Sequence, residues 1–413
     1  METRLADFIR DTPHGREADA ILRACVHCGF CTATCPTYQL LGDELDGPRG
    51  RIYQIKQVLE GLQPDRSTRM HLDRCLTCRS CETTCPSGVR YSRLLDIGRA
   101  VVAEKLPRPL HQRLLRWSLR KVLTVPGLFA PMLSLGQMTR GLQPAFLREK
   151  VPPRQKAPPI PAPSHSRKVI LAEGCVQPAY KPATNASLAR ILHRAGIDAI
   201  RAPGERCCGA VSFHLDAEAE ALDLMRANID AWWPHIEAGA EAIISSASGC
   251  GVMIKDYARA LEHDPQYAER AATVSGLCLD AVEFLSRVTL APVEEDSRLT
   301  VAFQSPCTLQ HGQQLAGRVE ALLSAAGHTV VPVPDSHMCC GSAGTYSILQ
   351  KSLSMRLRDR KISCLMEGNP DAIATANIGC QLHLENAARV PVRHWVELLD
   401  DGAGANPDGV ESR

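Results

Sequence analysis

The stretch CVHCGFCTATCP at residues 25–36 and its counterpart CLTCRSCETTCP at residues 75–86 decide how the first part of the chain folds. Both read C-x2-C-x2-C-x3-C-P. Three cysteines in one tight loop can reach three irons of one [4Fe–4S] cube, and the fourth, expected at the start of a helix, points away from it. In chains with two such motifs the fourth cysteine ligates the other cluster. The spacing therefore predicts two [4Fe–4S] clusters with crossed ligands.

Crossing assigns each motif's last cysteine to the other motif's cluster. The expected ligands are Cys25, Cys28, Cys31 and Cys85 for cluster one, and Cys75, Cys78, Cys81 and Cys35 for cluster two. Zinc is the nearest alternative, but structural zinc sites need only two C-x2-C pairs and use longer gaps. A third cysteine at the same interval, repeated in both motifs, favours iron–sulfur clusters. His27 is expected beside the site or at the surface, because cysteines fill every ligand position.

A helix is predicted between the motifs. The breaker pairs Gly-Pro and Gly-Arg precede an apolar pattern at helical spacing. Its members are Ile52, Ile55, Val58, Leu59 and Leu62. The 50 residues from Cys25 to Cys75 leave room for this helix, so the segment 1–100 resembles the helical ferredoxin domain of respiratory dehydrogenase subunits.

Composition excludes several classes of protein. The 413 residues carry 47 Lys+Arg and 45 Asp+Glu, which gives no argument for a nucleic-acid partner. The N-terminal stretch has no apolar signal region, and no segment approaches 18 uncharged apolar residues. We therefore expect the 18 cysteines to serve as metal ligands in a reducing compartment rather than as disulfides.

The segment 101–167 is expected to link the cluster domain to the rest. Residues 108–150 contain eight Lys/Arg and one acid, and LHQRLLRWSLRKVL alternates apolar and basic residues at helical spacing. We favour a helix that packs on the cluster domain or a partner subunit with a solvated basic face. The alternative is a helix that lies on an anionic membrane surface. The Pro-rich residues 151–167 read as a semi-rigid spacer and mark the main domain boundary.

The C-terminal half is an internal duplication. In each copy a strand-like apolar run ends in a cysteine, a Cys-Cys-Gly follows 32 residues later, and a fourth cysteine lies 42 or 40 residues beyond the pair. Alternating β and α patterns predict two parallel α/β units, residues 168–290 and 291–413, with these cysteines at the carboxyl ends of strands. The two sets are Cys175, Cys207, Cys208 and Cys250, and Cys307, Cys339, Cys340 and Cys380.

Four convergent thiols per unit suit an iron–sulfur cluster or a metal ion. A metal-free thiol pocket, or simple burial, is the alternative. Cys278 and Cys364 lie outside the repeated pattern and are expected in the core, because free cysteine behaves as a small hydrophobe. The fold class is thus α+β multidomain: a helical two-cluster ferredoxin domain followed by two α/β CCG domains.

The motifs together resemble the iron–sulfur subunits of glycolate oxidase and of anaerobic glycerol-3-phosphate dehydrogenase. The strings CPTYQLLGDELDGPRGRIY, PCTLQH and DSHMCCGSAGTYS are closest to the glycolate oxidase family. The resemblance implies oxidation of glycolate to glyoxylate by flavoprotein partner subunits, with electrons delivered to a quinone-type acceptor. The related heterodisulfide reductase subunits end the CCG pattern in CxxC, but here Ala247 and Asn377 replace the first of those two cysteines.

The chain is expected to have no catalytic residue of its own. It lacks a strand–GxGxxG–helix fingerprint, so FAD is expected only in partner subunits. The alternatives are the equivalent subunit for glycerol-3-phosphate or D-lactate, or a flavin-independent CCG thiol/disulfide redox protein. We expect a cytoplasmic protein. The alternative is a cytoplasmic protein in peripheral contact with the inner membrane through residues 108–150.

Overall fold

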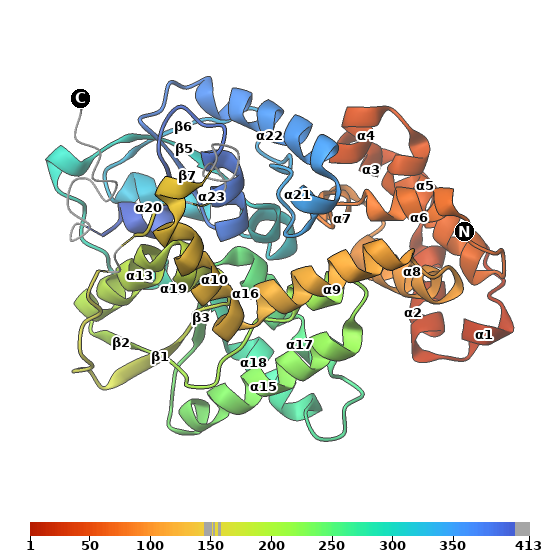
Figure 1. Cartoon of the computed structure of the whole chain (residues 1–413), viewed down its shortest axis with the longest axis horizontal. Helices are drawn as coiled ribbons and strands as arrows, with labels where there is room; N and C mark the ends of the chain where they lie inside the picture. Colours follow the sequence, from red (N-terminus) through yellow and green to blue (C-terminus); the bar gives the residue numbers. More distant parts are fainter. Residues whose placement is uncertain (144–150, 152, 156–157, 401–413) are drawn as a thin grey trace.

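The computed structural model describes residues 1–143, 151, 153–155 and 158–400. Parts of the basic segment (144–150), the spacer (152, 156 and 157) and the second α/β unit (401–413) lie outside the described residues. Figure 1 shows a helical unit beside two α/β units, which confirms the predicted fold class. Within the described residues, no helix has the length and apolar content needed to cross a membrane.

The first hundred residues form a helical unit around one hydrophobic core. Its elements are α1 (Asp7–Arg10), α2 (Pro13–Ala24), α3 (Phe30–Ala33), α4 (Pro36–Leu41), the 3-10 turn η1 (Glu44–Asp46), α5 (Pro48–Leu59), α6 (Arg66–Asp73), α7 (Ser80–Thr84) and α8 (Tyr91–Lys105). The helix expected between the two motifs is α5, which begins with Pro48, where the missing N–H is no loss. The expected apolar positions are buried from Ile52 to Leu59. Leu62 lies beyond the helix and is exposed, so its inclusion in that pattern was wrong.

Helices α5 and α8 approach each other closely at Gly98. A Cβ atom at this position would lie 2.6 Å from Cγ1 of Ile55, a distance that side chains do not tolerate. The lack of a side chain at Gly98 therefore sets how α5 lies against α8. This packing matters for the site, because α5 carries two of the arginines that face the cysteines.

The remaining chain builds two four-stranded parallel sheets. Their strand orders are β2-β1-β3-β4 and β6-β5-β7-β8, and every pairing is parallel. The strands are β1 (Arg167–Ala172), β2 (Ile197–Ile200), β3 (Ile243–Ser245), β4 (Cys278–Asp280), β5 (Thr300–Gln304), β6 (Thr329–Val331), β7 (Ala372–Thr375) and β8 (Val392–His394).

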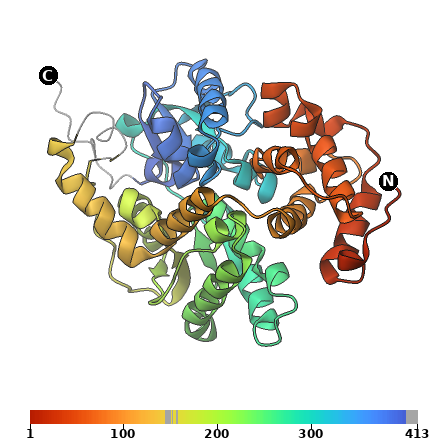
Figure 2. The ribbon, with the colours of Figure 1, turned by 45° about the vertical axis from the view of Figure 1, so that its right-hand side comes forward.

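Helices flank both sheets (Figure 2). Those of the first unit are α12 (Gln177–Tyr180), α13 (Pro182–Arg194), α14 (Ala210–His214), α15 (Glu218–Glu237), α16 (Ser248–Lys255), α17 (Tyr257–Ala260), α18 (Ala268–Leu277) and α19 (Ala281–Leu285). Those of the second unit are η3 (Glu295–Ser297), the π-helical turn η4 (Thr308–Gly312), α20 (Arg318–Ala325), α21 (Tyr346–Leu349), α22 (Lys351–Met366), α23 (Ile378–Glu385) and α24 (Trp395–Leu398).

The repeated pattern extends further than the cysteines indicated. Cys278 is buried, as expected, but it lies on β4, which occupies the same edge of its sheet as β8 does in the second unit. A short helix follows each of these strands, with Asp280 and His394 as equivalent N-caps. The sequence similarity is confined to AVEFL and WVELL, which is too short to stand out without the sheet order.

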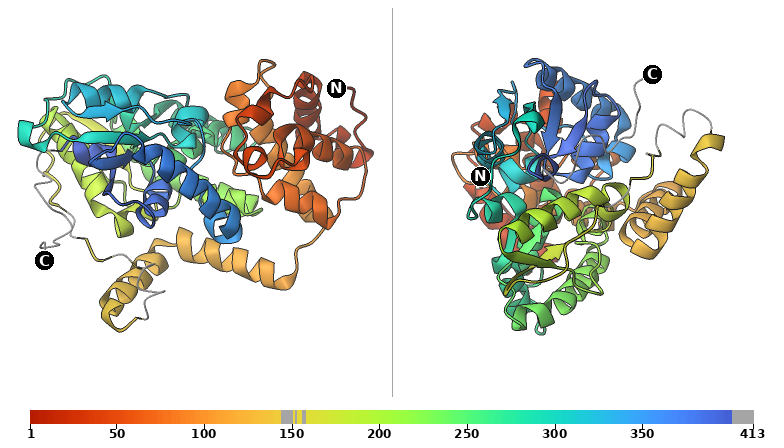
Figure 3. Two further views of the ribbon diagram at one scale, coloured as in Figure 1. Left: turned by 90° about the horizontal axis from the view of Figure 1, so that it is seen from above. Right: turned by 90° about the vertical axis from the view of Figure 1, so that its left-hand side faces the viewer.

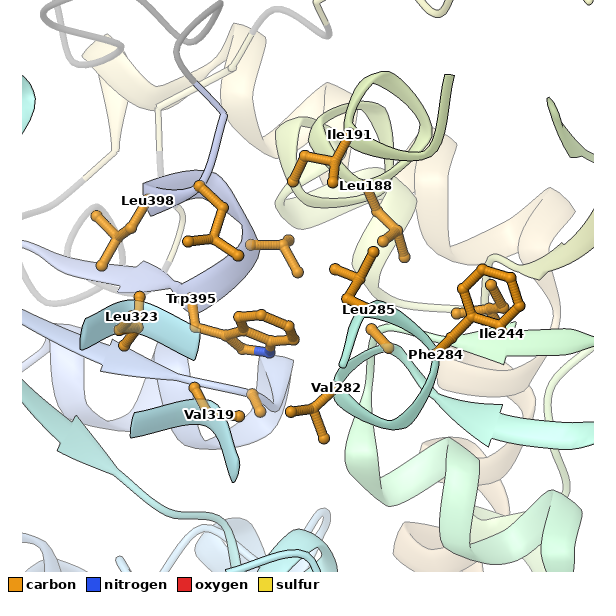
Figure 4. Packing of buried hydrophobic residues seen from close by; sticks show 14 of the residues in the cluster. Leu188, Ile191, Ile244, Val282, Phe284, Leu285, Val319, Leu323, Trp395 and Leu398 are labelled. Carbon is orange, nitrogen blue, oxygen red and sulfur yellow. The ribbon is translucent and has the colours of Figure 1, made fainter. Parts of the chain in front are cut away.

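The two α/β units share one hydrophobic core. In Figure 4, Leu188, Val282 and Leu285 of the first unit face Leu323 and Trp395 of the second. Burying these side chains removes a large apolar area from water, which stabilises the contact between the units. The duplicated halves are therefore held face to face.

The basic segment forms α9 (Leu110–Thr124) and α10 (Pro126–Met138), followed by the turn η2 (Arg140–Leu142). Arg108 pairs with Asp73 at 2.6 Å and with Asp216 at 3.0 Å, and Arg116 reaches the same two carboxylates. The expected packing on the cluster domain is thus present, but the solvated basic face is only partly confirmed. Arg108, Arg116 and Arg120 face acidic residues of the two units, whereas Arg113 is exposed. Figure 3 shows α9 and α10 on the outside of the molecule.

Acid should weaken the contact between the two α/β units through His394. Its Nε2 donates to the Ser246 carbonyl at 2.8 Å, and its Nδ1 accepts from the Val396 N–H. Burial lowers the pKa of His394 from 6.5 to about 4. The unfolded chain therefore takes up a proton first, and stability is lost as pH falls from about 6.5 toward 4, by roughly 2 kcal/mol at pH 5.

We expect His394→Gln, which retains a donor near the Nε2 position, to lose less thermal stability than the wild type between pH 7.5 and pH 5. Anaerobic thermal unfolding measures this difference. His263→Gln is the matched control, because the His263 side chain is 69% exposed. Equal acid sensitivity of the wild type and His394→Gln would contradict the assignment.

Candidate functional site

The first thiol set consists of Cys25, Cys28, Cys31 and Cys85, which line one pocket. The loop that carries the first three follows α2 and turns sharply, with His27 and Gly29 in the left-handed region. Cys85 comes from the other motif, at the end of α7. The helix start expected for this cysteine was therefore wrong: Cys85 ends a helix, and α8 begins only at Tyr91.

The second thiol set consists of Cys35, Cys75, Cys78 and Cys81, which line an adjacent pocket. Cys35 is the N-cap of α4, with Pro36 at the first helical position, as the Cys-Pro pair predicted. The loop after α6 repeats the geometry of the first, with Thr77 and Arg79 in the left-handed region. A non-glycine residue in this region costs about 1 kcal/mol.

Interactions with the α/β units hold that second loop. The guanidinium of Arg79 donates to Asp256 of the first unit at 2.7 Å. The hydroxyl of Tyr346, in the second unit, donates to the Arg74 carbonyl at 3.1 Å. The second thiol set is therefore anchored from both sides, while the first set lies nearer to solvent and includes the exposed Cys28.

Burial opposes charge on four of the eight thiols in these two sets. It raises the pKa of Cys31 to about 11, and it raises the pKa of Cys25, Cys35 and Cys81 as well. Four such groups within one pocket can all be thiolates only when a cation is bound among them, and a coordinating thiol is deprotonated outright. The donor set therefore fits a metal cluster. His27 lines the first pocket, and its buried Nε2 has no hydrogen-bond partner among the described residues, so it lies beside the site, as expected.

A buried network surrounds the second set. Arg51 is 1% exposed and donates to the His71 carbonyl at 2.7 Å, to the Thr37 hydroxyl at 3.1 Å and to Asp46 at 3.3 Å. The hydroxyl of Tyr91 donates to the Cys75 sulfur at 3.7 Å. Apart from Cys75, no residue of this network was singled out as a site residue from the sequence, although Arg51 belongs to the Gly-Arg pair that was interpreted as a breaker.

The third thiol set, in the first α/β unit, consists of Cys175, Cys207, Cys208 and Cys250. Cys175 follows β1, and Cys250 lies on α16 directly after β3, so both are at the carboxyl edge of the sheet. Cys207 accepts hydrogen bonds from Cys175 and then from Cys208, which holds its pKa well below the usual value. The pKa of both donors is raised correspondingly. This set therefore favours one thiolate, on Cys207.

The fourth thiol set, in the second α/β unit, consists of Cys307, Cys339, Cys340 and Cys380. The side chains are linked in that order by hydrogen bonds. For Cys339, the bond with Cys307 favours the thiolate, but the bond with Cys340 and burial outweigh it and raise the pKa to about 12. Cys307 also contacts Cys78 of the second set, so the second and fourth sets are adjacent.

The two positions without a cysteine are equivalent in the structure. Ala247 and Asn377 are the N-caps of α16 and α23. Nδ2 of Asn377 donates to the Cys380 sulfur at 3.6 Å, and Oδ1 of Asn377 accepts from the Gly249 N–H at 3.2 Å. Asn377 therefore connects the fourth thiol set to the helix that carries Cys250.

Two ionisable residues beside the thiol sets were missed from the sequence. Glu205 accepts from the Gly174 N–H and from Trp232 Nε1, and burial raises its pKa to about 7. Lys361 is 2% exposed, donates to two carbonyls, and has a pKa lowered by burial. Glu205 lies two residues before the Cys-Cys pair, and this position could have marked it as a candidate in the sequence. Lys361 carries no such signal, because it reaches the fourth set from α22.

The prediction for Cys364 was wrong. This residue is half-buried rather than in the core, and it lines a small hollow with Cys339 and Lys361. It lies on the same helix as Lys361, at i+3, so the two side chains share a face.

Comparison with known proteins agrees with this organisation. Residues 21–89 match a family model described as a 4Fe-4S dicluster domain, and residues 169–255 and 301–385 each match one described as a cysteine-rich domain. The family models therefore cover the segments that carry the four thiol sets.

Whole-chain relatives agree as well. The chain is 54% identical over 401 residues to the glycolate oxidase iron–sulfur subunit of Escherichia coli (strain K12), covering 97% of this chain and 98% of that protein. It is 30% identical to the probable glycolate oxidase iron–sulfur subunit of Bacillus subtilis (strain 168), over 92% and 94% of the two lengths. Lactate utilization protein A of Geobacillus kaustophilus (strain HTA426) is 26% identical over 56% of this chain and 98% of its own length. With its 4Fe-4S domain and paired cysteine-rich repeats, the chain belongs to the family of glycolate oxidase iron–sulfur subunits, which are components of an oxidoreductase complex.

Proposed function

We propose that this chain is the electron-transfer subunit of a glycolate dehydrogenase. In this proposal, flavin-containing subunits oxidise glycolate to glyoxylate, and the chain accepts their electrons and passes them toward a quinone-type acceptor. The observation that carries the proposal is the crossed arrangement of the cysteines: each of the first two sets joins three cysteines of one motif to the fourth cysteine of the other. The relatives named for glycolate oxidase support the choice of substrate.

Each segment of the chain has its own role in this proposal. We propose that residues 1–100 hold two [4Fe–4S] clusters and that 101–167 serve as a connecting segment. In the same proposal, residues 168–290 and 291–413 are the two CCG units. The protein is assigned to the cytoplasm, in agreement with cysteines kept reduced for metal binding.

The geometry of the thiols supports the proposal of two clusters. The first set would hold cluster one and the second set cluster two, and each bound cluster supplies a one-electron carrier. Pro48, Cys81 and Tyr91 line both pockets, so the two sites are adjacent. Adjacent carriers support rapid electron exchange, because tunnelling slows steeply with distance.

Serine variants test the crossing. Anaerobically loaded wild-type protein should carry about eight iron atoms in these two sites. Cys85→Ser should lose or alter the same EPR signal as Cys25→Ser, while Cys35→Ser should affect the same signal as Cys75→Ser. An uncrossed arrangement predicts the opposite pairing. Cys364→Ser, which lies outside the four sets, should leave both signals unchanged. Binding of zinc without iron at both sites would contradict the cluster assignment.

The partner proposal concerns one exposed surface. We define the α9–α10 apolar face by its exposed residues, which are Leu110, Leu114, Trp117, Leu128, Met132, Leu135, Met138 and Leu142. Three arginines that could attract anionic lipid form ion pairs with Asp216 or Glu220 instead. The side chains of Arg108, Arg116 and Arg120 are 9%, 13% and 17% exposed. An apolar face of this extent, with two of the three α9 arginines held in ion pairs with the body, favours a protein partner over a lipid surface. We assign it to a flavoprotein subunit.

Assembly with flavin subunits should depend on this face. The purified chain alone should oxidise no glycolate, and dye-linked activity should appear when the flavin subunits are added. The double variant Leu114→Glu/Trp117→Glu should co-purify poorly with those subunits and restore little activity, because charge on an apolar interface is costly. D-lactate and glycerol-3-phosphate, assayed in parallel, test the substrate.

Ile348→Glu is the matched control, because Ile348 is similarly exposed at 52% but lies in the second α/β unit. It should assemble normally. Normal assembly of the double variant would refute the assignment of the face, and loss of vesicle flotation alone would identify a membrane contact instead. Glycolate turnover by the flavin-free chain would refute the division of labour.

We propose further that at least one CCG unit holds a cluster or a metal ion. The support is the convergence of four thiols at the carboxyl edge of each sheet, where the third set already favours a thiolate on Cys207. Thiolates collect where a cation neutralises them. The contact between Cys78 and Cys307 would make the fourth set the nearer electron acceptor for cluster two.

Metal analysis of the full chain tests this proposal. We expect iron or zinc in excess of the amount that the first two sets hold. Cys208→Ser or Cys340→Ser should remove that excess without affecting the two EPR signals of the N-terminal clusters. Cys278→Ser, a buried cysteine outside the sets, is the control. If the wild type contains no such excess, the CCG cysteines are structural.

A further inference from the structure

The two N-terminal thiol sets have unequal electrostatic surroundings. The first pocket is lined by Arg49, whose side chain is 36% exposed and pairs with Glu44 at 2.8 Å. The second pocket is lined by Arg51, which is 1% exposed. A charge beside a cluster interacts more strongly when both are buried, because little water screens them. Arg51 should therefore act on its cluster far more strongly than Arg49 does.

The charge of Arg51 is incompletely neutralised. Its partner is Asp46, which is fully buried, but Asp46 also accepts from the guanidinium of Arg74 at 2.8 Å. One carboxylate is thus shared by two guanidinium groups. Burial by itself would lower the pKa of Arg51, yet the neighbouring Cys75, Tyr91 and Cys35 raise it, ahead of Asp46. Arg51 also lines the second pocket together with Cys35 and Cys75, so its positive charge lies beside the sulfur ligands.

Burial and charge act on the second cluster in opposite directions. A reduced cluster carries one more negative charge than an oxidised one, and burial disfavours that charge. The second set is the more enclosed, since the first includes the exposed Cys28. By burial alone, the second cluster would therefore have the lower reduction potential of the two. Net charge and hydrogen bonds to sulfur set the potentials of such clusters, and both are supplied here by Arg51 and Tyr91.

We propose that Arg51 is a positioning residue that raises the reduction potential of the second cluster above that of the first. This inference rests on the proposed function. One electron then passes from the reduced first cluster, loaded by the flavin subunits, to the oxidised second cluster, and no proton or atom moves with it. The electron comes to rest beside Cys78, which contacts Cys307 of the fourth thiol set. Arg51 thereby gives the chain a direction, from the solvent-facing set toward the CCG units.

The test is an EPR-monitored redox titration of the full chain, loaded anaerobically, with Cys25→Ser and Cys75→Ser proteins used to assign the two signals. In the wild type the second cluster should have the higher midpoint potential. Arg51→Gln should lower the potential of the second cluster to that of the first or below, and leave the first unchanged. Arg51→Lys should retain most of the wild-type potential, because it keeps the charge. Arg49→Gln is the matched control and should shift neither potential appreciably.

Three results would overturn the proposal: an unchanged gap between the potentials in Arg51→Gln, an equal shift of both clusters, or the same shift in Arg51→Lys as in Arg51→Gln. If Arg51→Gln cannot retain its cluster, Arg74→Gln decides, because Arg74 is 27% exposed and shares Asp46. A fall in the second potential supports the proposal and an unchanged one refutes it. The iron content of the wild type distinguishes these outcomes from failure of the cluster assignment. If the cluster assignment fails, the wild type will not contain two [4Fe–4S] clusters.

Discussion

Buried sulfur can carry negative charge only beside positive charge, and this constraint organises the molecule. The first two thiol sets are closed by cysteines from opposite motifs, and the burial of Cys31 and Cys81 would keep them protonated without a bound cation. Protein cations lie beside both sets, but the arginine at the second set, Arg51, is buried, whereas Arg49 at the first set is 36% exposed. Ligand convergence, burial and the placement of arginine thus belong to one electrostatic arrangement.

The same constraint explains how the units are joined. The basic segment that links them does not turn its charges to water: Arg108 and Arg116 lie between Asp73 of the helical unit and Asp216 of the first α/β unit. Such shared, partly buried pairs fix geometry more than they add stability, because the loss of hydration offsets much of the attraction. These pairs leave the α9–α10 apolar face exposed, and this is the surface that we propose binds a partner subunit.

The duplicated units have kept their architecture while their sites have diverged. Both sheets have the same strand order, and a common core joins them through Trp395 and Leu285. The third thiol set nevertheless favours one thiolate, whereas the fourth contacts the second set through Cys307. Position in the molecule, rather than cysteine spacing, distinguishes the two units.

The sequence by itself determined what depends on neighbours along the chain. The C-x2-C-x2-C loops, the helix start at Pro36 and the buried parallel strands follow from local spacing and apolar runs, which act over a few residues. The duplication was visible for the same reason. The weaker agreement of CLDAVEFL with VRHWVELL was visible only once the sheet order was known.

The tertiary structure decided what depends on residues far apart. The contact of Cys78 with Cys307 and the ion pairs of Arg116 and Arg120 with the body each join segments that no periodicity links. Nothing in the sequence marks Arg51 or Lys361 as buried, because a long basic side chain is usually solvated. Long-range packing decides whether such a charge lies in water or beside a buried sulfur, and local sequence patterns carry no information about that packing.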